Sequence, residues 1–276
     1  MRRFLVPLFV AASLIAITLH FSPGFSVSKI VFELPTAGDE TVQTSPELSQ
    51  PYKYLSHGRQ SFVFESADGK SVIKFFNRDY FHLRWYHHLP VPKEWKRREE
   101  KKFALRHQFF LESYPLAFKE LREEAGLLYI HLKKTEGQLP SVSLLDPSGR
   151  KISIDLNHAA FVLQKKAKPY LIHLDEVQKK EGTEGLKREI DALLAFCSKR
   201  IGKKIGDFDR DIQHNMGALD GQILFIDPGK LYRDENLLEP EVLQHEWWKA
   251  TSRLHKWLRA RDPEAAKYLS NQIPAS

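Results

Sequence analysis

The sequence contains very little cysteine: Cys197 is the only one among 276 residues. An intramolecular disulfide is therefore impossible, and there is no Cys-x-x-Cys pair of the kind that holds structural zinc. No internal repeat is present either. With 42% hydrophobic and 28% charged residues, the chain has the composition of a globular protein and not of a disordered one. Its length allows one domain of ordinary size, or one divided into two lobes.

Acidic residues are fewer than basic ones, which gives the chain a formal net charge of +7. This surplus is compatible with an anionic partner such as a nucleotide, a phosphorylated glycan, an acidic lipid or a nucleic acid. The charged run Lys93–Lys102 is mixed in sign, which favours a solvated helix face over a nucleic-acid patch. The sequence therefore argues against a nucleic-acid partner. Binding of anionic lipid or nucleic acid through residues 93–106 is kept as a third hypothesis, weaker than the two functions given at the end of this section.

The N-terminus has one long apolar run, from Phe4 to Phe21, preceded by Arg2 and Arg3. The run is just long enough to span a membrane, and no clear small-x-small cleavage site follows it. We expect residues 1–22 to be a signal anchor, with a cleaved signal peptide as the alternative, and residues 4–21 to contact the membrane. Because the positive charge precedes the run, the body is expected outside the cytoplasm, periplasmic or secreted. Residues 23–50 are polar and read as a linker.

Periodicity organises the first half of the folded part. "SFVFES" and "SVIKFFN" alternate around a turn and predict a β-hairpin, and a charged helix is expected to begin at Lys93. A second helix can begin at Pro115. The apolar residues at helical spacing after it are Phe118, Leu121, Ala125, Leu128 and Leu132.

The second half begins with another predicted hairpin, "SVSLLDPSGRKISIDLN", and a strand, "AAFVLQKK". An amphipathic helix is expected over residues 186–201, then the short hairpin "ALDGQILFI", and Pro240 introduces a last helical region. The order predicts an α+β fold, with its sheet in the first half and its helices in the second.

Lys74 is the most informative residue of the first hairpin. It shares a strand face with Val72 and Phe76, so its ammonium group must either reach water or meet an anion. The turn before this hairpin carries Ser56, Gly58 and Ser61, and small residues there would let backbone N–H groups approach a phosphate. Taken alone, these residues favour the simpler alternative, an ordinary polar turn before a hairpin.

Glu124 is the carboxylate that could reach Lys74 from the helix predicted after Pro115. On a helical wheel it lies beside the apolar stripe, closer than Glu120, while Glu123 lies almost opposite the stripe. A solvated flank is the alternative for each of these carboxylates.

An acidic stretch, "GDFDRDIQHNMGALDGQILFIDPGK", spans residues 206–230. A calcium loop is excluded, because Ile212 and Ala218 stand where that loop requires Gly and Glu. The pattern "ILFID" instead indicates a buried strand that delivers Asp227 to its end, with Asn215 in the loop before the hairpin. A carboxylate and an amide oxygen suit Mg²⁺, and an Asp upstream of Asn215 could take a proton from a hydroxyl nucleophile.

Together these motifs resemble the protein-kinase-like superfamily. That family has, in order, a Gly-rich loop, a strand Lys, a helix Glu, a catalytic Asp, a metal-binding Asn and Asp-Phe-Gly. In this sequence "LSHGRQSFV", "VIK", "DFDRDIQHN" and "IDPG" follow the same order over residues 52–230. The resemblance implies an α+β, two-lobed kinase-like fold, with a β-rich N-lobe over residues 51–168 and a small helical C-lobe over residues 169–276.

The resemblance also implies roles for individual residues. Ser56, Gly58 and Ser61 take the loop positions and Val63 the Val that follows the loop. Lys74 would bind the ATP phosphates and Glu124 would pair with it, while Asn215 and Asp227 would hold Mg²⁺. The base is ambiguous: Asp209 satisfies the family's spacing to the metal-binding Asp, whereas a shortened loop favours Asp211.

The departures from the family pattern affect the expected activity. Two of the three loop glycines are Ser, Pro228 replaces the Phe of Asp-Phe-Gly, and no Ala-Pro-Glu follows. Residues 228–276 are too few for a peptide-docking half. We therefore expect an ATP- and Mg²⁺-dependent phosphotransferase acting on a hydroxyl of a glycan, lipid or small molecule. The alternative is a catalytically inactive pseudokinase that binds or scaffolds a partner.

Overall fold

The computed structural model of the chain describes residues 24–32, 45–81, 92–209 and 211–273. The predicted anchor, residues 1–22, lies outside this part. Among the described residues, no helix combines the length and the apolar character needed to cross a membrane.

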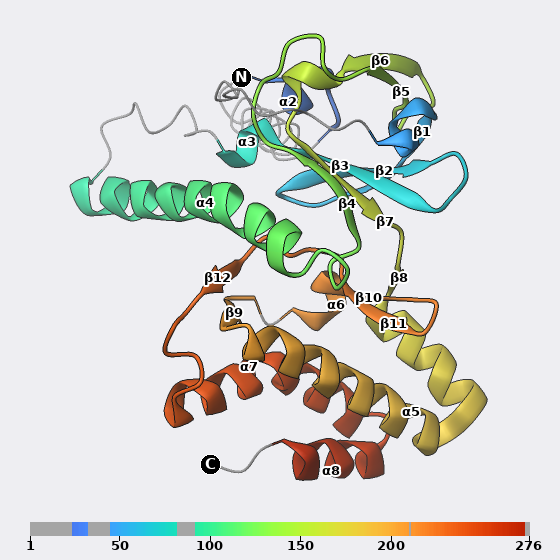
Figure 1. Ribbon diagram of the computed structural model, residues 1–276, viewed down its shortest axis with the longest axis vertical. Helices are drawn as coiled ribbons and strands as arrows, with labels where there is room; N and C mark the ends of the chain where they lie inside the picture. The colour runs from blue at the N-terminus through green and yellow to red at the C-terminus, as the bar shows by residue number, and fades with distance from the viewer. Residues whose placement is uncertain (1–23, 33–44, 82–91, 210, 274–276) are drawn as a thin grey trace, which may run out of the picture.

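The fold is a mixed α+β arrangement, as predicted. A seven-stranded sheet lies at one end of the molecule, three helices lie at the other, and the long helix α4 runs between them (Figure 1). The strands are β1 (Tyr52–His57), β2 (Ser61–Ser66), β3 (Ser71–Phe76), β4 (Leu127–His131), β5 (Ser141–Leu145), β6 (Lys151–Asp155), β7 (Phe161–Lys165), β8 (Lys168–Pro169), β9 (Ile205–Asp207), β10 (Met216–Leu219), β11 (Gln222–Phe225) and β12 (Leu231–Arg233). The helices are α2 (Val27–Ile30), α3 (Arg78–Phe81), α4 (Lys93–Glu120), α5 (Tyr170–Gly202), α6 (Ile212–Asn215), α7 (Pro240–Arg259) and α8 (Pro263–Gln272), with 3₁₀ turns η1 (Pro46–Ser49) and η3 (Leu156–His158).

The large sheet has the strand order β4-β7-β3-β2-β1-β5-β6, and all of its neighbours are antiparallel except β1 and β5. The predicted hairpins β2–β3, β5–β6 and β10–β11 are confirmed. Smaller ladders join β10 to β8 and β12 to β9. These two ladders lie between α4 and the lower helices, so they bring the acidic stretch under the large sheet (Figure 1).

The two faces of the sheet belong to two apolar cores. On β3, Ile73 and Phe75 pack into the core on the outer face, whereas Phe76 packs against α4 on the inner face. Because side chains two residues apart share a strand face, Lys74 points with Phe76 toward α4. The strand pattern therefore directs the ammonium group of Lys74 to the interior of the molecule.

The segment predicted as a linker is partly packed onto the outer core. Within residues 23–50, the described parts form α2 and η1, and they bury Ile30 and Leu48 completely or nearly so. These two side chains fix both described parts of the segment against the sheet.

The sequence predicted a helix from Pro115 through Leu132, and both of these end points are wrong. Helix α4 runs unbroken through Pro115 to Glu120, and residues 127–131 form β4. The buried residues Phe110 and Ala117 lie on both sides of Pro115, so the packing of one continuous face outweighs the hydrogen bond that proline cannot donate. Gly126, with φ of 56°, then turns the chain into the sheet.

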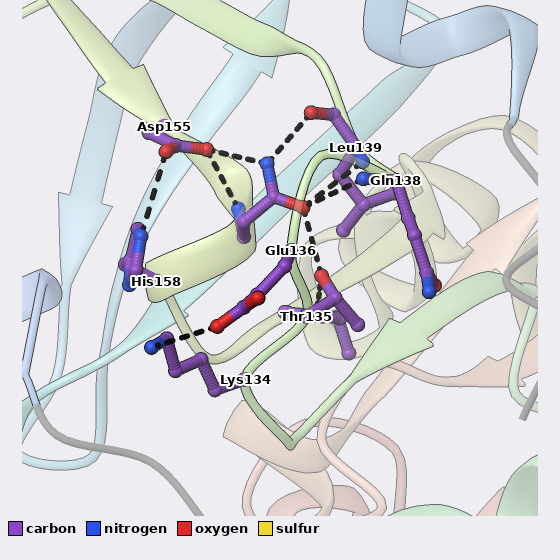
Figure 2. Close-up of polar contacts among 9 residues, drawn as sticks. Lys134, Thr135, Glu136, Gln138, Leu139, Asp155 and His158 are labelled. Carbon is purple, nitrogen blue, oxygen red and sulfur yellow. Dashed lines mark hydrogen bonds and ion pairs between the residues drawn. The ribbon is translucent and has the colours of Figure 1, made fainter. Parts of the chain in front are cut away.

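Asn157 fastens the connection between β4 and β5 to the turn before β7. Its partners Thr135, Gln138, Leu139 and Asp155 are labelled in Figure 2. Its side-chain oxygen accepts hydrogen bonds from Thr135 Oγ1 at 2.9 Å and from the N–H groups of Gln138 and Leu139 at 3.1 Å each. Its amide nitrogen donates to Leu139 O at 2.8 Å and to Asp155 Oδ1 at 2.7 Å. One buried amide thus satisfies the polar groups of two loops.

Replacing Asn157 by alanine is expected to lower the free energy of unfolding by about 2–3 kcal/mol, because three donors and two acceptors lose their partner at once. Chemical denaturation of the full chain measures this change. Asn236→Ala, at an exposed position before α7, is the matched control and should stay within about 0.5 kcal/mol of the wild type. Equal stability of the two variants would show that the network around Asn157 contributes nothing.

Candidate functional site

Lys74 meets an anionic partner in the folded chain. Its amino group donates a hydrogen bond to the carbonyl oxygen of Ile226, and its charged neighbour is the carboxylate of Asp227. Burial lowers the pKa of Lys74 below its usual value, and the Asp227 carboxylate opposes part of that shift. The strand lysine and the predicted metal-binding aspartate, far apart in the sequence, are therefore adjacent in space.

Asp227 is held in place by its surroundings. Its Oδ1 atom accepts hydrogen bonds from the hydroxyl of Tyr114 at 3.1 Å and from the N–H of Gly229 at 3.2 Å. A Cβ at position 229 would lie 2.9 Å from both Asp227 Oδ1 and Gln60 Nε2, so one of these side chains would have to shift. The glycine of "DPG" thus leaves room for the Asp227 carboxylate and for the Gln60 side chain from the β1–β2 turn.

Asn215 is linked to Asp227 through the backbone. The carbonyl oxygen of Asn215 accepts from the N–H of Ile226 at 2.8 Å and from the N–H of Asp227 at 3.3 Å. Helix α6, one turn long, ends at Asn215, and β10 begins directly after it. The short helix and the β10–β11 hairpin therefore place the amide of Asn215 beside the end of β11.

Asp209 belongs to the same cluster. Its Oδ2 atom lies 2.5 Å from Nζ of Lys230, and its side chain also forms a hydrogen bond with Asn215. Burial tends to raise the pKa of Asp209, but the hydrogen bond and charge of Lys230 outweigh burial and hold the pKa below its usual value. The structure therefore gathers Lys74, Asn215, Asp227 and Asp209, with Lys230 as a second lysine that sequence reasoning missed.

Asp211, the other candidate base, has different partners. Its carboxylate forms an ion pair with Arg253 at 3.3 Å on helix α7 and contacts Nδ1 of His214 at 2.8 Å. The geometry thus separates the two candidates: Asp209 contacts Asn215, whereas Asp211 contacts the helix beneath the loop.

Glu124 is not brought to Lys74, so the expected ion pair is not formed. Since α4 ends at Glu120, Glu124 lies in the turn before β4, where its carboxylate pairs with Lys199. Burial tends to raise the pKa of Glu124, but Lys199 outweighs it and the pKa is lowered. The helical wheel that placed Glu124 beside Lys74 assumed that the helix continues past residue 124, whereas α4 ends at Glu120.

The residues of the predicted phosphate loop lie on the β1–β2 hairpin. Ser56 is on β1, Gly58 is in the exposed turn, and Ser61 begins β2. The N–H of Gly58 donates to the carbonyl oxygen of Ser61 at 2.9 Å. Val63 lies directly across the ladder from Lys74. The hairpin therefore reaches the site from the sheet side, and the binding role of its turn stays a prediction.

Beneath the site lies a buried ionic cluster that the sequence gave no reason to expect. Nη1 of Arg200, on α5, lies 2.7 Å from Oε1 of Glu246, on α7. Glu246 Oε1 also accepts from the N–H of Asp207 at 3.1 Å, and Nζ of Lys249 donates to the Asp207 carbonyl oxygen at 2.9 Å. Charges on two helices therefore hold the backbone at the end of β9, where the acidic loop starts.

Asp207 is the carboxylate whose titration is most altered. Burial raises the pKa of Asp207 to about 7, although the charge of Arg200 opposes the shift. Its side chain accepts from the N–H of Asp209 at 2.8 Å, and it borders a cavity of about 20 Å³, enough for about one water molecule. The alternating Asp207, Asp209 and Asp211 were visible in the sequence, but which of them is buried was not.

The site has the donor set that Mg²⁺ prefers, although it is small. Within the described ranges, no three His, Cys, Asp or Glu side chains gather as a self-sufficient metal site. The oxygens of Asp227 and Asn215 fit instead a cation that takes few protein ligands and completes its shell with phosphate and water.

Comparison with known proteins gives only a distant likeness. No protein-family model matches the chain, and no curated protein matches it. Two solved structures of WbdD, one described as a bifunctional kinase-methyltransferase, resemble it at 12% sequence identity with TM-scores of 0.37 and 0.33. The match covers 82% and 79% of this chain but only 47% and 44% of those chains, so this chain spans less than half their length.

Proposed function

We propose that this chain is a kinase-like protein that binds ATP with Mg²⁺ and transfers a phosphoryl group to a hydroxyl acceptor. The observation that supports the proposal most is the meeting of Lys74, from the third strand of the sheet, with Asp227 and Asn215 from the far half of the chain. In the protein-kinase-like superfamily, a lysine on the third strand and an Asp and Asn in the other lobe have these relative places. The large sheet would be the N-lobe and the helices α5, α7 and α8 the C-lobe.

Each residue of the site has a definite task in this proposal. Lys74 binds the nucleotide phosphates, and the small residues of the β1–β2 turn, Ser56, Gly58 and Ser61, cover them. Asp227 and Asn215 would hold Mg²⁺, which neutralises phosphate charge when bound. The rest of catalysis is positioning and charge stabilisation by groups that are already in place.

Two carboxylates can accept the proton of the acceptor hydroxyl. Asp209 lies against Asn215 and Lys230, whereas Asp207 has a pKa of about 7, which suits a general base at neutral pH. We assign the role to Asp209 because its side chain contacts Asn215, one of the two proposed Mg²⁺ ligands. The acceptor is expected to be a glycan, a lipid or a small molecule that presents a hydroxyl group.

Calorimetric titration of the full chain with ATP, in the presence and absence of Mg²⁺, tests the proposal. We expect Mg²⁺ to tighten ATP binding by the wild type, and Asp227→Asn to weaken MgATP binding at least about tenfold because one metal ligand loses its charge. Asp220→Asn removes the same charge from the exposed β10–β11 turn and should bind as the wild type does. Absence of Mg²⁺-dependent nucleotide binding in the wild type rules the proposal out.

The same preparation separates an enzyme from a pseudokinase. A kinase-like enzyme with MgATP forms ADP slowly even without its acceptor, because water can substitute for the hydroxyl. MgATP binding with no ADP formed, and no phosphate transferred to any hydroxyl acceptor offered, would instead favour a binding or scaffolding module.

A further inference from the structure

Tyr114 lies on the buried side of α4, whereas the carboxylate that the resemblance predicted beside Lys74, Glu124, lies beyond the end of this helix. The buried side of this helix consists of Phe110, Ser113, Tyr114 and Ala117. The ring of Tyr114 packs edge to face on Phe76 with centroids 5.1 Å apart, and Phe76 shares a strand face with Lys74. The phenol is thereby directed toward the Lys74–Asp227 pair, and no acidic residue lies on this side of α4.

The hydroxyl of Tyr114 forms a hydrogen bond with one carboxylate oxygen of Asp227. It donates to Asp227 Oδ1, the oxygen that also accepts from the N–H of Gly229. The phenol has one proton to donate, and this hydrogen bond uses it. No described residue hydrogen-bonds to Oδ2, which is therefore the oxygen left to bind a cation.

Ser113, the residue before Tyr114, forms a second contact between α4 and residues 227–231. Ser113 Oγ donates to the carbonyl oxygen of Leu231 at 2.7 Å, and both groups are buried. Two adjacent helical residues thus fasten α4 to both ends of residues 227–231. The Tyr114 hydrogen bond thereby ties the position of the Asp227 carboxylate to that of α4.

We propose that Tyr114 is the positioning residue of the metal-binding carboxylate: it fixes Asp227 Oδ1 from α4, so that Oδ2 is presented to the cation. In this chain α4 would therefore act on the metal side of the nucleotide site, through Asp227, instead of on Lys74 through an ion pair. The inference rests on the proposed function for the role of Asp227. It adds the residue that makes MgATP binding depend on the position of α4.

Tyr114→Phe tests the inference, with Tyr170→Phe as the matched control. Tyr170 is also buried and donates a hydrogen bond, to the Glu189 carbonyl oxygen at 3.0 Å, but on α5. We expect Tyr114→Phe to weaken MgATP binding about tenfold, the lower end of the effect of losing one hydrogen bond to a charged group. Binding of ATP without Mg²⁺ should not change. Tyr170→Phe is expected to leave both affinities unchanged.

A double-mutant cycle distinguishes positioning from a general structural role. Because Tyr114 acts through Asp227, Tyr114→Phe should cause no further loss of MgATP affinity in an Asp227→Ala background, which lacks the oxygen that accepts from Tyr114. In urea denaturation without nucleotide, the stability losses of the two single variants should likewise fail to add in the double variant.

The outcomes separate the inference from the function on which it rests. If Asp227→Asn impairs MgATP binding but Tyr114→Phe does not, the positioning role is wrong and the proposed function stands. Equal losses from Tyr114→Phe in both backgrounds, or additive stability losses, would also overturn it. A wild type without Mg²⁺-dependent binding removes the proposed function itself.

Discussion

Replacing Glu246 by alanine is expected to destabilise the protein by about 3–5 kcal/mol, because it leaves Arg200 charged and uncompensated in the interior. Both side chains are almost fully buried, and 2.7 Å separates Nη1 of Arg200 from Oε1 of Glu246. The variant also removes the acceptor of the Asp207 N–H and the partner of Lys249. Three elements, α5, α7 and β9, lose their common contact at once.

Urea denaturation at neutral pH measures this effect, and two further variants make it specific. Glu241→Ala removes an exposed carboxylate from the first turn of the same helix and should cost less than about 1 kcal/mol. The double replacement Arg200→Met with Glu246→Leu should recover most of the loss, since well-packed apolar residues can replace a buried ion pair. A Glu246→Ala protein within about 1 kcal/mol of the wild type would show that Arg200 is compensated in another way.

The ionic cluster of Arg200, Glu246 and Lys249 matters for function because it binds the backbone of β9, directly before the acidic loop. Glu246 and Lys249 bind the N–H and the carbonyl oxygen of Asp207, and Nη1 of Arg200 donates to the Ile205 carbonyl oxygen at 2.5 Å. The loop with Asp209 and Asn215 begins at this fixed strand end. In a Glu246→Gln protein, which keeps an acceptor but not the charge, we expect an intermediate loss of stability.

Replacing Asp207 by asparagine is expected to change how stability depends on pH. The pKa of Asp207 is about 7 in the folded protein, against a usual value of 3.8. Between these values the folded state binds a proton that the unfolded state has released, so this group's contribution to stability falls as pH rises from about 4 through about 7. Below about pH 4 the contribution is fully present, and above about pH 8 it is lost.

Asparagine stays neutral at every pH and keeps an oxygen for the Asp209 N–H. Relative to the wild type, Asp207→Asn should therefore become more stable by about 3 kcal/mol between about pH 5 and about pH 8.5. Urea denaturation of both proteins at the two pH values gives this difference directly, and other titrating groups cancel in it. A difference that does not change with pH would mean that Asp207 ionises normally in the folded protein.

Several parts of the fold and of the site could be predicted from local sequence patterns. The alternation in "SVIKFFN" indicated both the strand and the face on which Lys74 lies, and "ILFID" indicated that Asp227 follows a strand. Both depend on the twofold period of a strand, which needs no knowledge of the partner. Asn215 and Asp209 were placed by their order in the chain.

The wrong predictions arose where the helical spacing of apolar residues continued beyond the end of the helix itself. The apolar spacing after Pro115 suited a helix through Leu132, but Gly126 and the pairing of β4 with β7 turned those residues into the sheet. Because Glu124 depended on that helix, its expected contact with Lys74 failed as well. Sheet pairing is a contact between distant segments, and a helical wheel contains no information about it.

The sequence by itself determined the α+β order of elements, the side chains that share a strand face with Lys74, and the positions of Asn215 and Asp227 beside one hairpin. Only the tertiary structure decided that Tyr114 contacts Asp227, that Lys230 pairs with Asp209, and that Arg200 and Glu246 are buried together. The physical reason is that periodicity reports which face of an element is buried, whereas burial of a charge depends on which other charge the packing brings to it.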